Sequence, residues 1–160
     1  YGFTVFENSQ ALKDDATAAG VALTERADYN NFYRQQQQKL GKDYLSQRVI
    51  KSDQPRILQS GLRGPADLEA LHQVGGVVVA LVCQPATAVA RIDKKLSKNA
   101  QSVEQYLDQV SIDKSSDGYG SDTSWVVDHA DYQIDTSGPV EQTRAKLDQV
   151  MAEILSRLDQ

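Results

Sequence analysis

The stretch Gly75-Gly76-Val77-Val78-Val79-Ala80-Leu81-Val82, which Cys83-Gln84-Pro85 follows, decides the fold class of this chain. A short, continuous aliphatic run between a Gly-Gly pair and a proline is typical of a parallel strand that is buried on both faces. Residues 77–82 therefore predict a strand in the interior of a sheet that helices cover.

Strands and helices alternate on both sides of this run. Strands are predicted over residues 3–6, 56–59 and 132–134, and helices over 11–19, 24–49 with a break at Gly41, 65–74, 87–96, 102–112 and 139–158. Ser9 is expected to cap the first helix, and Pro65 suits the first turn of the helix after the second strand. The alternation predicts an α/β fold with a largely parallel sheet.

The composition is that of an ordinary globular domain. The chain has 160 residues, of which 40% are hydrophobic and 24% are charged, enough to bury a core without cross-links. The 17 Lys and Arg against 22 Asp and Glu give a net charge of −5, which argues against a nucleic-acid-coating protein. The single cysteine, Cys83, excludes an internal disulfide framework, and no apolar run reaches the roughly 18 residues of a membrane helix. We expect a cytoplasmic protein that is a monomer or a homodimer.

Several short motifs occur in a specific order along the chain. They are Gly61-x-Arg63-x-Pro65, then Gly75-Gly76 with the aliphatic strand, then Arg91-Ile92, and finally Ala130-Asp131 before the last predicted strand. Their order and spacing resemble the later part of P-loop nucleoside-phosphate kinases, with dephospho-coenzyme A kinase-like and adenylate kinase-related proteins as the nearest relatives.

The resemblance implies a fold and an activity. The fold is a three-layer αβα, P-loop NTPase-like parallel sheet over residues 1–160, forming a single domain with a helical acceptor lobe at about 24–50 and a lid at about 91–124. The activity is transfer of a phosphoryl group from ATP, with Mg²⁺, to a nucleotide or a dephospho-coenzyme A-like small-molecule acceptor.

The phosphate-binding loop of that family is missing from these residues. The loop, Gly-x-x-x-x-Gly-Lys-Ser/Thr, cradles phosphates with its backbone N–H groups and its lysine. In the family it follows the first strand, which is central in the sheet between the third and fourth strands. Without it, two inner strands would each present an unpaired edge. We therefore expect the central strand and its loop to precede Tyr1 in a longer polypeptide.

The expected metal position also departs from the family. Many relatives have an acidic residue at the end of the third strand, which helps to organise Mg²⁺, whereas this chain reads Gln59-Ser60-Gly61. Neither side chain supplies the carboxylate that a hard cation favours. An alternative function is therefore a kinase-like module that binds a nucleotide or a protein without phosphoryl transfer. A third possibility is another α/β nucleotide- or flavin-binding fold, which would have a different strand order.

Three arginines are candidate substrate-binding residues. Arg63 follows a strand and precedes a helix, a position that faces the ligand crevice of α/β folds, where a guanidinium can fork onto a phosphate. The alternative is an ion pair with Asp67 or Glu69. By resemblance, Arg26 and Arg34 would neutralise the acceptor phosphate; the alternative for both is a solvated helix charge.

The resemblance assigns further residues to the lid and the base-binding loop. Arg91 and Lys95, with Lys94 between them, fall where relatives carry lid arginines that offset charge on the transferred group, so Arg91 and Lys95 are the catalytic candidates. A solvated helix face is the alternative for the lysines.

Thr136, Ser137 and Gly138 resemble the loop that borders the adenine of ATP, and the alternative is a helix cap before Pro139. The aromatic residues Tyr29, Phe32 and Tyr33 either stack on a base or pack between helices.

Overall fold

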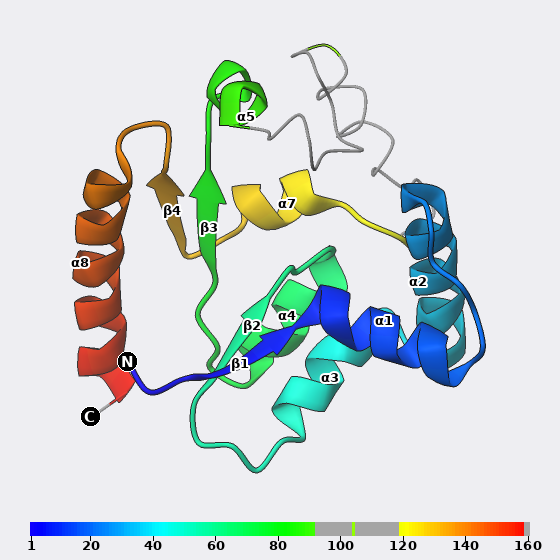
Figure 1. Ribbon diagram of the computed structural model, residues 1–160. Helices are drawn as coiled ribbons and strands as arrows, with labels where there is room; N and C mark the ends of the chain where they lie inside the picture. The colour runs from blue at the N-terminus through cyan, green and yellow to red at the C-terminus, as the bar shows by residue number, and fades with distance from the viewer. Residues whose placement is uncertain (92–103, 105–118, 159–160) are drawn as a thin grey trace. The chain divides into compact units, whose positions relative to one another are not determined.

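The computed structural model describes residues 1–91, 104 and 119–158 (Figure 1). These residues form the alternating α/β architecture that the sequence predicts. The elements are β1 (Thr4–Glu7), α1 (Asn8–Ala18), α2 (Arg26–Leu40), α3 (Tyr44–Ile50), β2 (Ile57–Ser60), α4 (Pro65–Gln73), β3 (Val79–Val82), α5 (Pro85–Arg91), α7 (Thr123–Asp128), β4 (Tyr132–Asp135) and α8 (Val140–Leu158). Among the described strands, β1 pairs with β2 and β3 pairs with β4, both in parallel.

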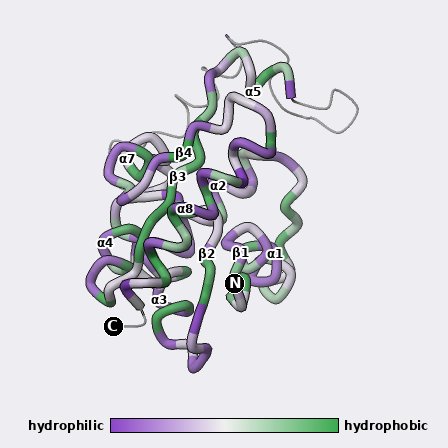
Figure 2. Tube along the Cα trace, turned by 90° about the vertical axis from the view of Figure 1, so that its left-hand side faces the viewer, coloured by the Kyte–Doolittle hydropathy of each residue, from purple (hydrophilic) through white to green (hydrophobic). Residues whose placement is uncertain are grey.

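Strand β3 is the aliphatic strand of the sequence prediction, and its tube is green in Figure 2. Val78 and Ala80 are buried. Leu81, however, is 60% exposed, although its register partner on β4, Ile134, is buried. The prediction of a strand buried on both faces is therefore wrong at Leu81, because no element within the described ranges covers that side chain.

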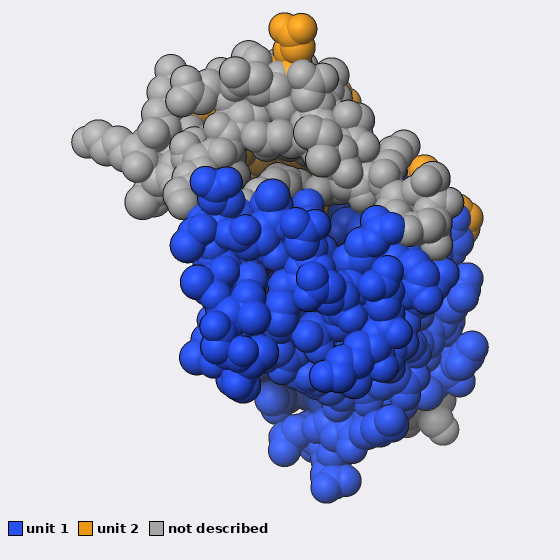
Figure 3. Space-filling model, turned by 90° about the vertical axis from the view of Figure 1, so that its right-hand side faces the viewer, with its two compact units in different colours: residues 1–76, 114–126 blue, residues 77–113, 127–160 orange. Residues whose placement is uncertain are grey.

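The chain divides into two compact units, residues 1–76 with 114–126 and residues 77–113 with 127–160 (Figure 3). We call them unit 1 and unit 2. The core of unit 1 gathers apolar side chains from its first three helices: Leu12, Ala16, Phe32, Tyr33, Tyr44 and Leu45. Each unit thus has one parallel strand pair, and the single kinase-like domain expected from the resemblance stays a prediction.

Local sequence explains how the helices of unit 1 begin and end. Helix α1 starts at Asn8 directly after β1, so Ser9 lies inside the helix and the predicted Ser9 cap is wrong. A capping box of Glu25 and Asp28 starts α2, and Gly41, at a φ of 112°, ends it as predicted. Helix α4 begins at Pro65, as predicted.

In unit 2, α8 packs against β4 and buries Ile134, Met151 and Ile154. The guanidinium carbon of Arg157 lies 5.9 Å from the ring centre of Tyr132. Apart from residue 104, the predicted helix at 102–112 falls outside the described residues, as do Lys94, Lys95 and most of the expected lid. Of the helices that are described, none is both long enough and apolar enough to cross a membrane.

Candidate functional site

Residues Gly61–Gly64, which we call the Arg63 turn, connect β2 to α4 in unit 1. Gly61 has a φ of 81°, which favours glycine. Its carbonyl oxygen accepts a hydrogen bond of 3.0 Å from Nδ2 of Asn8. The backbone N–H of Arg63 donates to Oδ2 of Asp67 at 3.3 Å, and the Arg63 carbonyl accepts from the N–H of Asp122 at 2.6 Å. The turn is therefore fixed at three backbone atoms.

A buried polar network lies beneath the turn and joins five side chains: Asn8, Tyr33, Ser46, Gln59 and Asp67. The carboxylate of Asp67 accepts hydrogen bonds from Ser46 Oγ at 2.8 Å and from the Tyr33 hydroxyl at 3.3 Å. Nε2 of Gln59 donates to Asn8 Oδ1 at 2.8 Å and to Ser46 Oγ at 3.1 Å. The network thus connects four helices to strand β2.

Burial dominates the electrostatics of this network. Desolvation raises the pKa of the Asp67 carboxyl above its ordinary 3.8, while the hydrogen bonds from Ser46, the Arg63 backbone and Tyr33 act in the opposite direction. Desolvation and the neighbouring Asp67 charge raise the pKa of Tyr33, so its hydroxyl keeps the proton that it donates. Burial therefore disfavours a negative charge on Asp67, and hydrogen bonds from three donors partly offset this cost.

The side chain of Arg63 is exposed, and its guanidinium makes no hydrogen bond or ion pair with any other residue that the structure describes. Asp67 binds the backbone of Arg63 and not its guanidinium, and Glu69 forms no ion pair with it. The helix-start ion pair considered from the sequence is therefore absent within the described ranges. A cation that has no partner among the described residues, on a fixed turn at the carboxyl end of a parallel strand, is able to bind a phosphate.

The other predicted acceptor residues lie on α2, in the same unit. Arg26 is the first residue of this helix, and Arg34 is half-buried and already has an interaction partner. Phe32 and Tyr33 belong to the buried core, and the half-buried Tyr29 packs against it. Packing between helices is therefore the role of Phe32 and Tyr33, because buried rings offer no face to a base.

Unit 2 brings together Arg91 and the loop Thr136–Gly138, which the sequence analysis assigned to separate functions. Nη1 of Arg91 donates to the Thr136 carbonyl at 2.6 Å, and Nη2 donates to the carbonyls of Ser137 at 3.2 Å and Gly138 at 2.8 Å. The arrangement follows from topology, since Arg91 ends the helix after β3 while the loop follows its neighbour β4.

Further bonds anchor this loop to β3. The Thr136 N–H and hydroxyl both donate to the Val82 carbonyl, at 2.8 and 2.9 Å. The N–H of Gln84 donates to Ser137 Oγ at 3.0 Å. The loop carbonyls that could accept hydrogen bonds from the edge of a base thus already accept hydrogen bonds from Arg91. The catalytic role of Arg91 stays a prediction.

The end of β2 does not fit a protein-bound Mg²⁺. No group of three or more His, Cys, Asp or Glu side chains able to hold a metal occurs in the ranges that the structure describes. The amide nitrogen of Gln59 donates hydrogen bonds to Asn8 and Ser46. Its Oε1 is buried and has no hydrogen-bond partner among the described residues. Ser60 carries no charge, so this strand end supplies no anionic ligand.

Sequence reasoning missed Asn8 and Ser46 as parts of the site, and it considered Gln59 only as a residue that lacks the carboxylate expected at the metal position. The available indications were weak: Asn8 lies two residues after a predicted strand, and Asp67 lies four residues after Arg63. Comparisons with protein-family models and with curated proteins found no match for the chain. The candidate site therefore depends on its geometry alone.

Proposed function

We propose that this chain is part of a cytoplasmic P-loop nucleoside-phosphate kinase, which transfers the γ-phosphoryl group of MgATP to a nucleotide or a dephospho-coenzyme A-like acceptor. The observation that carries the proposal is the strand pairing. In the family, the first strand separates the third from the fourth, so the other four strands form two parallel pairs. The described strands pair in that way, β1 with β2 and β3 with β4.

The complete fold in this proposal is a three-layer αβα sheet with a fifth, central strand that belongs to the full-length polypeptide and leads into the phosphate-binding loop. Two further features support it. All four described strands pair on one side only within the described ranges, so β2 and β3 each have an edge at which the proposed central strand would pair. Val5 and Leu58 are register partners, and their side chains are 59% and 44% exposed. Such exposure is expected if a layer of the complete fold, beyond the described residues, covers this face of the strands.

In the proposed reaction, an acceptor oxygen bonds to the γ-phosphorus of ATP while the bond from this phosphorus to the bridging oxygen breaks, and ADP leaves. A hydroxyl acceptor releases its proton to water, whereas a phosphate acceptor reacts as an anion and has no proton to release. Arg63 binds the acceptor phosphate, supported by Arg26 and Arg34. Positioning and electrostatic stabilisation supply the catalysis, as is general for such transfers.

In this proposal Arg91 and Lys95, the two residues assigned to the lid, have different roles. Arg91 holds the Thr136–Gly138 loop, which borders the adenine, through three carbonyl oxygens. Lys95, outside the described residues, remains the candidate for offsetting charge on the transferred group. Mg²⁺ enters as the counter-ion of ATP, since the end of β2 offers no carboxylate.

The alternative is a kinase-like module that binds a nucleotide or a protein without transfer. The specific observation in its favour is Gln59, which occupies the region where relatives have an acidic residue and is held in the buried network.

The test uses the full-length natural protein. Calorimetry measures binding of MgATP, AMP and dephospho-coenzyme A, and a coupled assay measures ADP release with each acceptor. Turnover with one acceptor supports the kinase; binding without turnover across the panel supports a nucleotide-binding module, and no binding at all contradicts both the kinase and a nucleotide-binding module.

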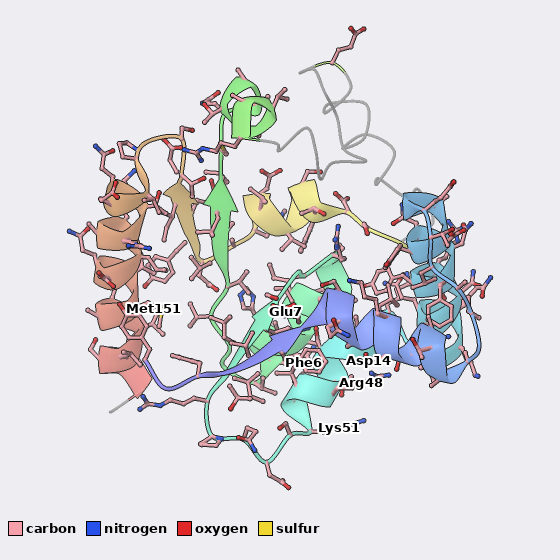
Figure 4. All side chains as sticks on the ribbon, viewed as in Figure 1. Phe6, Glu7, Asp14, Arg48, Lys51 and Met151 are labelled. Atoms are coloured by element: carbon pink, nitrogen blue, oxygen red, sulfur yellow. The ribbon has the colours of Figure 1, made fainter. Side chains whose placement is uncertain are left out.

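A charge-matched pair of variants then tests the site. Arg63→Gln is expected to weaken acceptor binding about 10- to 100-fold, because a hydrogen-bonded charge is lost. Arg48→Gln removes the same charge from α3, where Arg48 pairs with Asp15 at 2.8 Å and lies beside α1 (Figure 4), and is expected to leave binding unchanged.

A further inference from the structure

Two buried side chains from different helices hold the Arg63 turn at its two ends. Asn8 of α1 is 4% exposed and bonds the carbonyl of Gly61, while Asp67 of α4 is 1% exposed and bonds the N–H of Arg63. Neither contact involves the guanidinium of Arg63. The turn backbone is therefore fixed, while no residue in the described ranges occupies the guanidinium.

The two anchors belong to one continuous chain of hydrogen bonds. Gln59 Nε2 donates to Asn8 Oδ1 and to Ser46 Oγ, and Ser46 Oγ donates to Asp67 Oδ1. Because Gln59 donates to the oxygen of the Asn8 amide, the nitrogen of that amide is directed to Gly61. Position 8 must therefore donate and position 67 must accept, and buried networks of this kind fix one geometry.

We propose that Asn8 and Asp67 are positioning residues that immobilise the backbone of the Arg63 turn, so that only the Arg63 side chain, and not the turn, has to be ordered when a phosphate group binds. Fixing a binding group in advance reduces the entropy lost on association. The phosphate ligand rests on the proposed function, whereas the immobilised turn does not.

Isosteric exchanges test the donor and acceptor roles in the full-length protein. The measurement is hydrogen exchange of the Arg63 backbone amide by NMR. Asn8→Asp removes the donor to Gly61, and exchange at Arg63 is expected to accelerate about tenfold or more. Asp67→Asn replaces one of the two acceptor oxygens by a donor group, although Asp67 accepts at both, so exchange at Arg63 is expected to accelerate about tenfold as well.

Two further variants keep the test valid if the buried charge of Asn8→Asp prevents folding. Asn8→Ala removes the same bond without adding charge, and it is expected to accelerate exchange similarly. Tyr33→Phe removes a hydroxyl bonded to Asp67 that does not touch the turn, and Arg63 protection is expected to remain. Unchanged exchange in Asn8→Ala, or equal acceleration in Tyr33→Phe, would overturn the positioning role.

Calorimetry with AMP and with inorganic phosphate tests the ligand. Asn8→Ala and Asp67→Asn are each expected to weaken binding about tenfold, while Tyr33→Phe binds like the wild type. Equal weakening in Asn8→Ala and Tyr33→Phe at matched stability contradicts positioning. If the wild type binds neither probe while the exchange pattern holds, the phosphate ligand and the proposed function fail and the immobilised turn stands.

Discussion

The hydroxyl of Ser46 donates a hydrogen bond of 2.8 Å to Oδ1 of Asp67, and both side chains are buried. The second oxygen of the same carboxylate accepts from the Tyr33 hydroxyl and from the Arg63 N–H. Helices α2, α3 and α4 thus meet at one buried carboxylate, whose donors replace the water that it loses on folding.

Removing the Asp67 carboxylate is expected to destabilise the protein. Asp67→Ala leaves two buried hydroxyl donors and the part-buried N–H of Arg63 without this acceptor, so the free energy of unfolding should fall by about 2–3 kcal/mol in urea titrations. Tyr33→Phe, which loses one bond to the same carboxylate, should cost about 1 kcal/mol. Equal stability of Asp67→Ala and the wild type would show that the network contributes nothing.

The stability of the folded state should depend on pH through Asp67. Burial raises the pKa of Asp67 in the folded protein above its ordinary 3.8, so the folded state holds this proton to higher pH than the unfolded state does. As pH rises above about 3.8 toward the folded value, the wild type should therefore lose stability relative to Asp67→Asn. The test is to measure the free energy of unfolding of both proteins as a function of pH. A gain of wild-type stability relative to Asp67→Asn as pH rises from about 3.8 contradicts the prediction.

The conformation of Gly61 should make this position intolerant of a side chain. Gly61→Ser places a Cβ on a backbone at φ 81°, and a loss of about 1–2 kcal/mol is expected. Gly64→Ser is the matched control, because Gly64 has a φ of −156° at the N-cap of α4 and an added Cβ there meets only ordinary contacts. Thermal unfolding of both variants makes the comparison, and equal losses would contradict the argument.

Arg91 should hold the Thr136–Gly138 loop in a way that lysine cannot reproduce. Arg91→Lys keeps the charge but lacks the planar fork that reaches three carbonyls, so the loop should loosen at a cost of about 1 kcal/mol. The loosening should appear as lower NMR order parameters of the Ser137 and Gly138 amides in Arg91→Lys. Lys146→Met, which removes one bond of 3.3 Å to the Asp135 carbonyl, is the control and should leave the loop rigid.

Local sequence patterns predicted most elements but not their packing. Gly41 and Pro65 marked the boundaries of α2 and α4 correctly, because a positive φ and a missing N–H are properties of single residues. The Ser9 cap was wrong because β1 runs directly into α1 and places Ser9 inside the helix. Burial of Leu81 was wrong because exposure depends on which elements lie above the strand.

The sequence by itself determined the alternation of strands and helices, the glycine at the Arg63 turn and the placing of an arginine after a strand. These follow from backbone preferences and from the two- and 3.6-residue periodicities of neighbouring residues. Only the tertiary structure decided that Asn8, Ser46 and Asp67 share one network and that Arg91 binds the loop at 136–138. Such partners are separated by tens of residues, and a hydrogen bond between them needs an orientation that no local pattern specifies.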